Sequence, residues 1–203
     1  TTTTRDTLSL HDALPISLPL LASADVIWVS LDGPRQVHDA YRGRSYDRIM
    51  ENIAAARHPR VLANLTINRL NWEGIPELVR DLKGRVSGIT IQFAYPYPDG
   101  EDLTVSPQAR SQVLDQLIAL KRQGYPILDS YRVLQRLKHN SWRCHDWLIA
   151  NVEPDGQINY GCYLRGRGEI DCRQCGFAAH AELSRAYDWD PAAILCGRQV
   201  FGF

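Results

Sequence analysis

The cysteines are the residues whose type and spacing point most directly to chemistry. The chain has 203 residues, and its five cysteines all lie in the last third, at Cys144, Cys162, Cys172, Cys175 and Cys196. Seventeen, nine and two residues separate the first four from one another in turn. Four thiolates are the ligand count of a tetrahedral zinc site or of an iron–sulfur cluster. We therefore expect the first four cysteines to hold one metal or cluster together.

The spacing leaves several alternatives open. It does not separate zinc from iron–sulfur, although a zinc ribbon usually has two Cys-x-x-Cys pairs and this chain has one. Cys172 and Cys175 could instead form a redox pair, but they lie in a loop of glycines and charges rather than at the start of a helix. His145 and His180 are conceivable substitute ligands that fit local or surface roles better. Cys196 occupies an apolar helix position and is expected in the core.

Composition excludes two other classes of function. Lys plus Arg and Asp plus Glu both number 23, so the formal net charge is zero and no broad nucleic-acid surface is expected. The chain has no continuous apolar run of about 18 residues, so no membrane span is expected. An odd cysteine count gathered at one end fits a metal site better than a disulfide framework. These features favour a cytoplasmic protein.

Upstream of the cysteines, the pattern predicts three strands separated by two helices. The strands are apolar and rich in β-branched residues, and they are expected at residues 24–33, 60–67 and 88–95. Ser45 is expected to cap the first helix and Asn71 to open the second. Short β-α-β-α-β connections are typical of a parallel sheet with crossover helices. The predicted fold class is therefore α/β.

The pattern changes near residue 140. Before that point, Ser106 starts a long helix that ends at Gly124, and a shorter helix covers residues 131–138. After it, residues 147–164 read as an antiparallel hairpin around a Pro-Asp-Gly turn, bracketed by cysteines. Two further helices are expected at residues 177–187 and from residue 190 onward. We therefore expect two structural units, residues 24–139 and 140–203.

The first residues need separate treatment. The stretch "TTTTRDTLSLHDALPIS" resembles a weak signal peptide when read with the apolar residues that follow, but it has one basic residue and is interrupted by proline. Residues 6–16 resemble more closely a translated sequencing adapter. We therefore expect residues 1–23 to be non-native or disordered and residues 1–16 to make few core contacts.

The segment "VSLDGPRQVHDAYRGRSYDRIMENI" runs from the first predicted strand into the first predicted helix. It resembles the fourth strand and following helix of the radical S-adenosylmethionine (SAM) superfamily, especially of members that carry a C-terminal SPASM or twitch auxiliary-cluster domain. The segments "LTINRLN" and "ITIQFAYP" resemble its fifth and sixth strands. The segments "NVEPDGQINYGCYLRG" and "CRQCGF" resemble the auxiliary hairpin and its paired cysteines. The resemblance covers residues 24–203.

This resemblance implies the C-terminal half of a partial (β/α)6 barrel, strands four to six, followed by a small iron–sulfur auxiliary domain. The implied cofactors are a [4Fe–4S] cluster and SAM, and the implied chemistry is formation of a 5′-deoxyadenosyl radical that modifies a peptide, lipid or small metabolite. Flavodoxin or ferredoxin would supply electrons. By position, Ser30, Asp32 and Asn64 become candidate SAM contacts. Asp32 also suits a turn-fixing role, Ser30 a strand cap, and Asn64 the outer face of the sheet.

The chain also departs from the family pattern. It contains neither the Cys-x-x-x-Cys-x-x-Cys loop that binds the catalytic cluster nor the Gly-Gly-Glu segment that contacts the SAM amino group. We therefore expect this chain alone to be inactive in SAM cleavage. The residues His38-Asp39 and Arg42-Gly43 are expected to organise a loop over the barrel mouth. The competing interpretation is a non-enzymatic α/β domain whose cysteines form a structural zinc knuckle used for binding.

Overall fold

The computed structural model describes residues 24–97, 100–153, 155–165 and 169–202. The predictions for the adapter-like head and the segment 1–23 lie outside these ranges.

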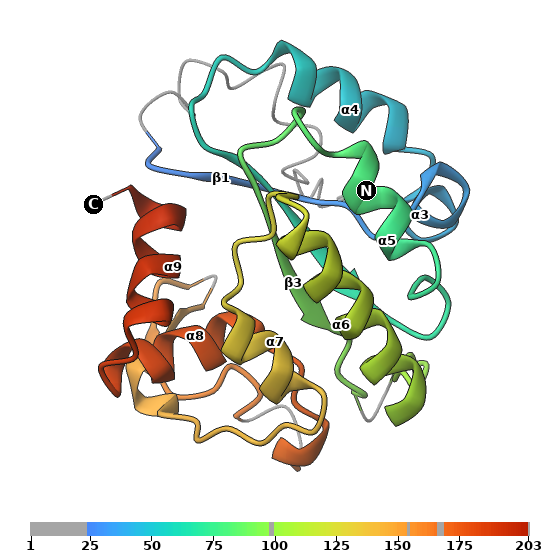
Figure 1. Cartoon of the computed structure of the whole chain (residues 1–203). Coiled ribbons are helices and arrows are strands. Elements are labelled where there is room, and N and C mark those ends of the chain that lie inside the picture. Colours follow the sequence, from blue (N-terminus) through green and yellow to red (C-terminus); the bar gives the residue numbers. More distant parts are fainter. Residues whose placement is uncertain (1–23, 98–99, 154, 166–168, 203) are drawn as a thin grey trace, which may run out of the picture.

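A parallel three-stranded sheet forms the centre of the molecule. Strands β1 (Ile27–Ser30), β2 (Val61–Ile67) and β3 (Gly88–Phe93) lie side by side in that order (Figure 1). The predicted β-α-β-α-β order and the α/β class are therefore confirmed. Within the described ranges the strands form a small open sheet rather than a closed barrel.

One face of the sheet is apolar and carries the main core. Helices α4 (Tyr46–Ala55), α5 (Ile75–Asp81) and α6 (Pro107–Arg122) contribute buried side chains to the same cluster as alternate strand residues such as Val29, Ala63 and Ile91. Successive strand side chains point to opposite faces of a sheet. The residues between these apolar ones therefore form a second face, and most of them are polar. Burial of each large aliphatic side chain contributes about 1.5–3 kcal/mol, which makes the helix-covered face the main source of stability.

The second face is partly covered by the last helix. Leu62 lies between two residues of the main core but packs instead with Cys196 and Val200 of α9 (Pro191–Phe201). The ring of Trp28 meets Phe201 edge to face, with centroids 5.8 Å apart. The α9 helix therefore packs against the second face through Leu62 and Trp28, and the expected core position of Cys196 is confirmed.

A short helix that the sequence pattern did not predict carries His38, Asp39 and Arg42, which were expected to organise a loop over the barrel mouth. Helix α3 (Arg35–Arg42) begins after Pro34 and ends at Gly43, whose φ of 66° is the left-handed conformation that glycine adopts at low cost. The predicted Ser45 cap was wrong, since the Ser45 hydroxyl donates to the Arg42 carbonyl and caps no amide of α4.

The sheet extends by one segment that the sequence pattern did not predict. Residues 126–129 run parallel to β3, with a single bridge between Ile89 and Ile127. The Ile89 amide donates to the Pro126 carbonyl at 2.7 Å, and the Ile91 amide donates to the Asp129 carboxylate at 2.9 Å. Asp129 therefore lies at the carboxyl end of a short fourth strand-like segment.

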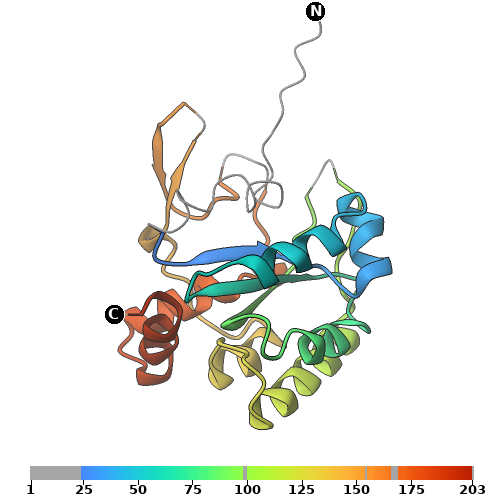
Figure 2. The same ribbon diagram turned by 90° about the horizontal axis from the view of Figure 1, so that it is seen from above.

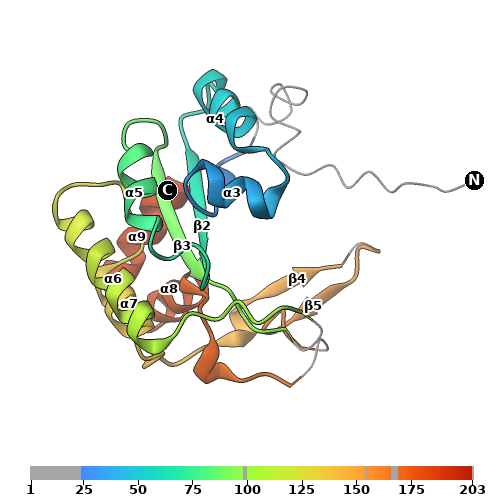
Figure 3. The same ribbon diagram turned by 90° about the vertical axis from the view of Figure 1, so that its right-hand side faces the viewer.

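The last third contains the predicted hairpin and helices. Strands β4 (Ala150–Val152) and β5 (Ile158–Tyr160) pair antiparallel and extend away from the sheet and helices (Figures 2 and 3). Helices α7 (Tyr131–Leu137) and α8 (Ala178–Tyr187) complete the described elements together with two short 3₁₀ turns, η1 (Asp146–Leu148) and η2 (Cys172–Gln174). Ala178 and Ala181 of α8 belong to the main core. No helix in the described ranges is both long and apolar enough to cross a membrane.

Candidate metal centre and cofactor face

Four of the five cysteines line one cavity of about 480 Å³. Cys144 and Cys172 are exposed, and Cys162 and Cys175 are half-buried. Cys196 lies elsewhere, on the side of α9 that packs against Leu62. The cavity wall also includes Tyr95, Asn140, Trp142, Asp146, Leu164, Arg165, Ile170, Arg173 and His180. A void of this size is in the range that accommodates a small molecule or a polynuclear group rather than a single ion.

The hairpin brings the first two thiols to the cavity. Cys144 lies two residues before η1 and Cys162 two residues after the end of β5, so the antiparallel pairing returns the chain to its starting side. The Gly161 amide donates to the Ile149 carbonyl at 2.8 Å and closes the base of the hairpin. An ion pair between Arg165 and Asp146 joins the two segments again, with 2.5 Å between Nη2 and Oδ2.

The Cys-x-x-Cys loop is held by a half-buried arginine that sequence reasoning missed. Arg110 of α6 donates to the Cys175 carbonyl at 2.9 Å and to Asn140 Oδ1 at 2.7 Å. Asn140 in turn donates to the Arg173 carbonyl at 2.6 Å. Burial lowers the pKa of Arg110 to about 10, and its guanidinium lies 4.3 Å from the centre of the Phe93 ring. No local motif marks Arg110, because its partners are 27 to 65 residues away.

The electrostatics of the thiols do not suit a redox pair. Burial, with a further rise from the three neighbouring thiols, raises the pKa of Cys175 to about 11, although the Phe177 amide hydrogen bond to Cys175 opposes this rise. Burial and Asp146 also raise the pKa of Cys144. A reactive thiol needs a lowered pKa. The raised pKa values of Cys144 and Cys175 therefore describe thiols that stay protonated at neutral pH.

The two histidines considered as substitute ligands have different surroundings. His145 is buried, donates its backbone amide to Ser184 Oγ at 2.9 Å, and places Nε2 2.8 Å from Asp188 Oδ1. His180 lines the cysteine cavity. Among the described residues, no three histidine, cysteine or carboxylate side chains lie close enough together to hold one metal ion as they stand.

A second candidate surface is the polar part of the sheet face opposite the main core. Ser30, Asn64 and Thr90 are register partners on adjacent strands, and Thr66 pairs with Gln92 in the next row. All five are half-buried, and their neighbours in sequence on β2 and β3 are buried. Hydrogen bonds of 3.1 Å join Thr90 to Asn64 and Gln92 to Thr66. Asn64 thus lies on the face of the sheet opposite the main core.

Three of these five residues were missed by sequence reasoning. The signal was the alternation in "ITIQF" and "ANLTI", where polar residues recur at every second position of otherwise apolar strands. This pattern indicates a strand with one polar face, and it places Thr66, Thr90 and Gln92 beside Ser30 and Asn64.

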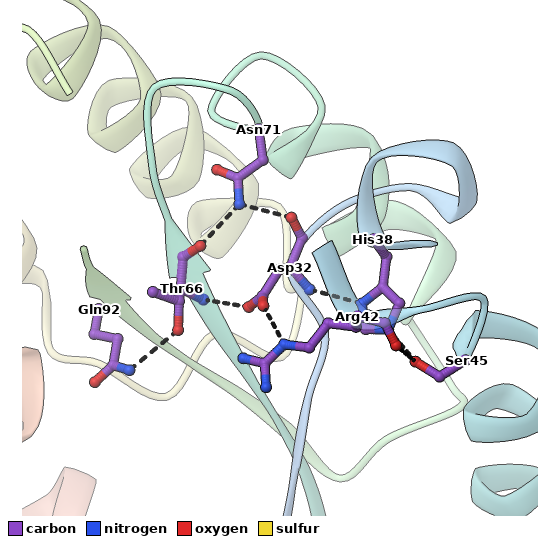
Figure 4. A network of polar contacts seen from close by, with 7 residues as sticks. All are labelled: Asp32, His38, Arg42, Ser45, Thr66, Asn71 and Gln92. Atoms are coloured by element: carbon purple, nitrogen blue, oxygen red, sulfur yellow. Dashed lines mark hydrogen bonds and ion pairs between the residues drawn. The ribbon is translucent and has the colours of Figure 1, made fainter. Parts of the chain in front are cut away.

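Asp32 is the centre of a buried polar network (Figure 4). Its carboxylate accepts from Arg42 Nε at 2.7 Å and from the Thr66 amide at 3.3 Å. Its amide donates to His38 Nδ1 at 3.2 Å, so His38 Nδ1 is an acceptor and carries no proton. Its carbonyl accepts from Asn71 Nδ2 at 2.6 Å. These contacts are those of a residue that fixes the turn after β1, which is the role considered for Asp32 beside SAM contact.

Asn71 opens no helix and instead ties two strands together. Its Nδ2 donates to the Asp32 carbonyl and, at 2.8 Å, to the Thr66 carbonyl, and its Oδ1 accepts from the Asn68 amide at 2.7 Å. Helix α5 begins only at Ile75. The prediction that Asn71 starts the helix was wrong because a buried amide gains more from these strand-end partners than from a helix cap.

Two buried carboxyl groups lie near the end of the sheet. Desolvation and the nearby Glu182 raise the pKa of Asp129 to about 7. Desolvation also raises the pKa of Glu182, whose Oε1 accepts from the Ser130 amide and whose Oε2 has no hydrogen-bond partner. Lys121 lies close enough to oppose both rises. The hydrogen bond between Glu182 and Ser130 connects α8 to the chain just after the strand-like segment 126–129.

Comparison with known proteins gives only a partial similarity. Packaging protein 1 of Human adenovirus C serotype 5, and that of serotype 2, are each 26% identical to the chain over 89 residues. The match covers 43% of this chain and 18% of each viral protein, so the chain spans less than a fifth of the curated relatives it matches. No protein-family model and no solved structure matches the chain. The function therefore has to be argued from the site.

Proposed function

We propose that this chain is part of a radical SAM enzyme, in which the four cysteines hold an auxiliary [4Fe–4S] cluster and the polar sheet face contacts SAM. The observation that carries the proposal is the gathering of Cys144, Cys162, Cys172 and Cys175 around one cavity while Cys196 lies apart. Four thiolates match the four irons of such a cluster. When bound, the cluster would supply one-electron transfer and would cross-link the loops that carry its ligands.

The fit of the cavity to a cluster supports this reading over a zinc knuckle. The void is larger than a single tetrahedral ion requires, since zinc–sulfur bonds of about 2.3 Å draw four thiolates into close contact. The Arg110 and Asn140 contacts hold the Cys-x-x-Cys loop in place.

The sheet face supports the SAM part of the proposal. In open parallel sheets, ligands bind beyond the carboxyl ends of the strands. Ser30 is the last residue of β1, and Thr66 and Gln92 each lie one residue before the end of their strand, on the face opposite the main core. Hydroxyl and amide groups can both donate and accept, which suits the ribose hydroxyls and the amino-acid carboxylate of SAM. Asp32 acts behind these residues by holding the turn after β1 and the Thr66 amide of β2.

Metal analysis after anaerobic reconstitution tests the proposal. The chain is incubated with iron and sulfide under reducing conditions, desalted, and assayed for iron, zinc, sulfide and visible absorption. We expect a brown protein with four iron and four sulfide ions per chain. A Cys196→Ala variant serves as the matched control and should retain the same content, because Cys196 is a core residue.

A colourless protein that binds one zinc per chain and no iron would contradict the proposal and favour the zinc-knuckle alternative. Retention of a full cluster after replacement of all four cavity cysteines would contradict the ligand assignment.

A further inference from the structure

His180 is an unexplained polar group in the wall of the cysteine cavity. It lies in the first turn of α8, five residues after Cys175. Its ring packs against two aromatic rings, with centroids 5.1 Å from Phe177 and 6.0 Å from Tyr163. Its Nδ1 is buried and has no hydrogen-bond partner. A buried polar atom without a partner costs about 1–3 kcal/mol, so native structures rarely leave one in this state.

His145 shows how the same chain satisfies a buried histidine elsewhere. Its Nε2 pairs with Asp188 and its backbone amide with Ser184, so the protein supplies its partners. His180 differs because it adjoins the space enclosed by the four thiols. A half-turn of the ring about its Cβ–Cγ bond exchanges the positions of Nδ1 and Cδ2, so the imidazole can direct a nitrogen toward that space without backbone movement.

We propose that His180 donates a hydrogen bond to a sulfur of the cluster held by the four cysteines and thereby raises the reduction potential of that cluster. The inference rests on the proposed function and assigns a positioning and tuning role within the same site. Both the neutral and the protonated imidazole carry an N–H donor, so the role does not depend on protonation state. Hydrogen bonds to cluster sulfurs are one of the factors that set iron–sulfur potentials.

Direct coordination of iron by His180 is the alternative to a hydrogen bond, and it would require His180 to replace a cysteine ligand. The four cysteines already supply one ligand for each iron of a [4Fe–4S] cluster. A hydrogen bond requires no exchange of ligands and satisfies the orphaned group. It also stabilises the reduced cluster more than the oxidised one, because reduction adds negative charge to the sulfurs. Loss of the donor should therefore make the cluster harder to reduce.

The test is a redox titration of the reconstituted full chain, followed by electron paramagnetic resonance. We expect His180→Phe to lower the midpoint potential, so that the ratio of reduced to oxidised cluster at a fixed potential falls about tenfold, equivalent to about 59 mV for one electron. His180→Gln keeps a donor and should recover part of the loss. His139→Gln, at an exposed histidine outside the cavity, should match the unmodified chain. His180→Leu repeats the test if His180→Phe loses its cluster.

The possible results separate the His180 hydrogen bond from the proposed iron–sulfur site. An unchanged midpoint potential in His180→Phe with full cluster content overturns the hydrogen bond while leaving the proposed function intact. Strong nitrogen hyperfine coupling in the unmodified chain, lost in the variants, would show iron coordination and also overturn it. Failure of the unmodified chain to take up iron and sulfide overturns the proposed function, and this inference with it.

Discussion

At the scale of single residues, the cavity thiols and the buried acids carry the main chemical consequences of the structure. The thiols are individually unremarkable cysteines in an exposed or half-buried setting, and their significance comes from sharing one cavity. Cys172 stands at the start of η2, and Asp171 directly before it caps that turn through the Arg173 amide at 3.0 Å. Substitution of Cys172 therefore removes one proposed ligand, while Asp171 still caps η2.

Cys172→Ser should weaken binding of the cluster. One iron then lacks its protein thiolate, so we expect the cluster to be lost more readily and less iron to remain after desalting than in the unmodified chain. We also expect faster proteolysis of the segment after residue 140, because a small loop-rich unit depends on its metal for stability. Iron assay and limited proteolysis measure the two effects. Equal iron content in Cys172→Ser and Cys196→Ala would contradict the assignment of Cys172 as a ligand.

The buried Asp129 carboxyl predicts a specific pH dependence of stability. Burial raises its pKa to about 7 in the folded protein, whereas an unfolded carboxyl has a pKa of about 4. Between these values the folded protein holds a proton that the unfolded chain has released. The stabilising contribution is therefore complete below about pH 4 and is lost as the pH rises through about 7.

Asp129→Asn replaces this titrating group with a neutral one whose oxygen can still accept from the Ile91 amide. We expect the variant to gain stability relative to the unmodified chain as pH rises from about 4 to about 7, by roughly 1 kcal/mol per pH unit. Urea denaturation at several pH values measures this difference. Glu51→Gln, at an exposed helix position, should show no such trend. A difference that stays constant with pH would contradict the assignment.

At the scale of elements, the approach of α8 to β3 fixes the cysteine loop against the sheet. Gly176 follows Cys175 directly, and its carbonyl accepts from the Phe93 amide at 2.9 Å. A β-carbon at Gly176 would lie 2.3 Å from Phe93 Cβ and 2.9 Å from Phe93 Cα, so no side chain fits there without movement of the backbone. This contact couples the position of Cys175 to the last strand of the sheet.

Gly176→Ala should therefore destabilise the protein by about 1–3 kcal/mol and reduce iron retention, because α8 and the loop before it must move away from β3. Gly197→Ala is the matched control. A β-carbon at Gly197 meets no atom within 4 Å, and alanine favours the interior of α9 by about 0.5–1 kcal/mol. Thermal unfolding and iron assay compare the two. A neutral effect of Gly176→Ala on both would contradict the coupling of loop and sheet.

The elements differ in how far the sequence could predict them. The three strands and the hairpin followed from apolar runs, alternation and a Pro-Asp-Gly turn, which are local signals. The single bridge of residues 126–129 has no such signal, because it depends on Ile89 lying alongside Ile127. Arg110 was missed for the same reason, since its partners Asn140 and Cys175 come close only in the folded chain. The cysteines were predictable because their residue type is itself the signal.

At the scale of the whole molecule, the two candidate surfaces belong to one folded unit. The core that supports the sheet also includes Ala178 and Ala181 of α8, the helix that follows the Cys-x-x-Cys loop. The hairpin that carries Cys162 at its end extends outward from this body (Figure 3). Helix α8 therefore links the cysteine cavity, through His180, to the core that supports the sheet, through Ala178 and Ala181.

The chain by itself should not cleave SAM. Its four cavity cysteines would saturate the irons of one cluster, and its sequence has no Cys-x-x-x-Cys-x-x-Cys loop to hold another with an open coordination position. We expect the reconstituted chain, supplied with dithionite and SAM, to form no 5′-deoxyadenosine above a cluster-free control, as measured by chromatography. Sustained formation of this product would contradict the assignment of the cavity to an auxiliary cluster.

Anomalous diffraction from crystals of the reconstituted chain, recorded above and below the iron absorption edge, tests the central claim most directly. The claim is that one iron–sulfur cluster lies among Cys144, Cys162, Cys172 and Cys175. The account predicts one strong iron peak inside the cavity bounded by these four sulfurs, with none beside Cys196. A peak that appears only at the zinc edge, or an iron peak outside the cavity, would contradict it.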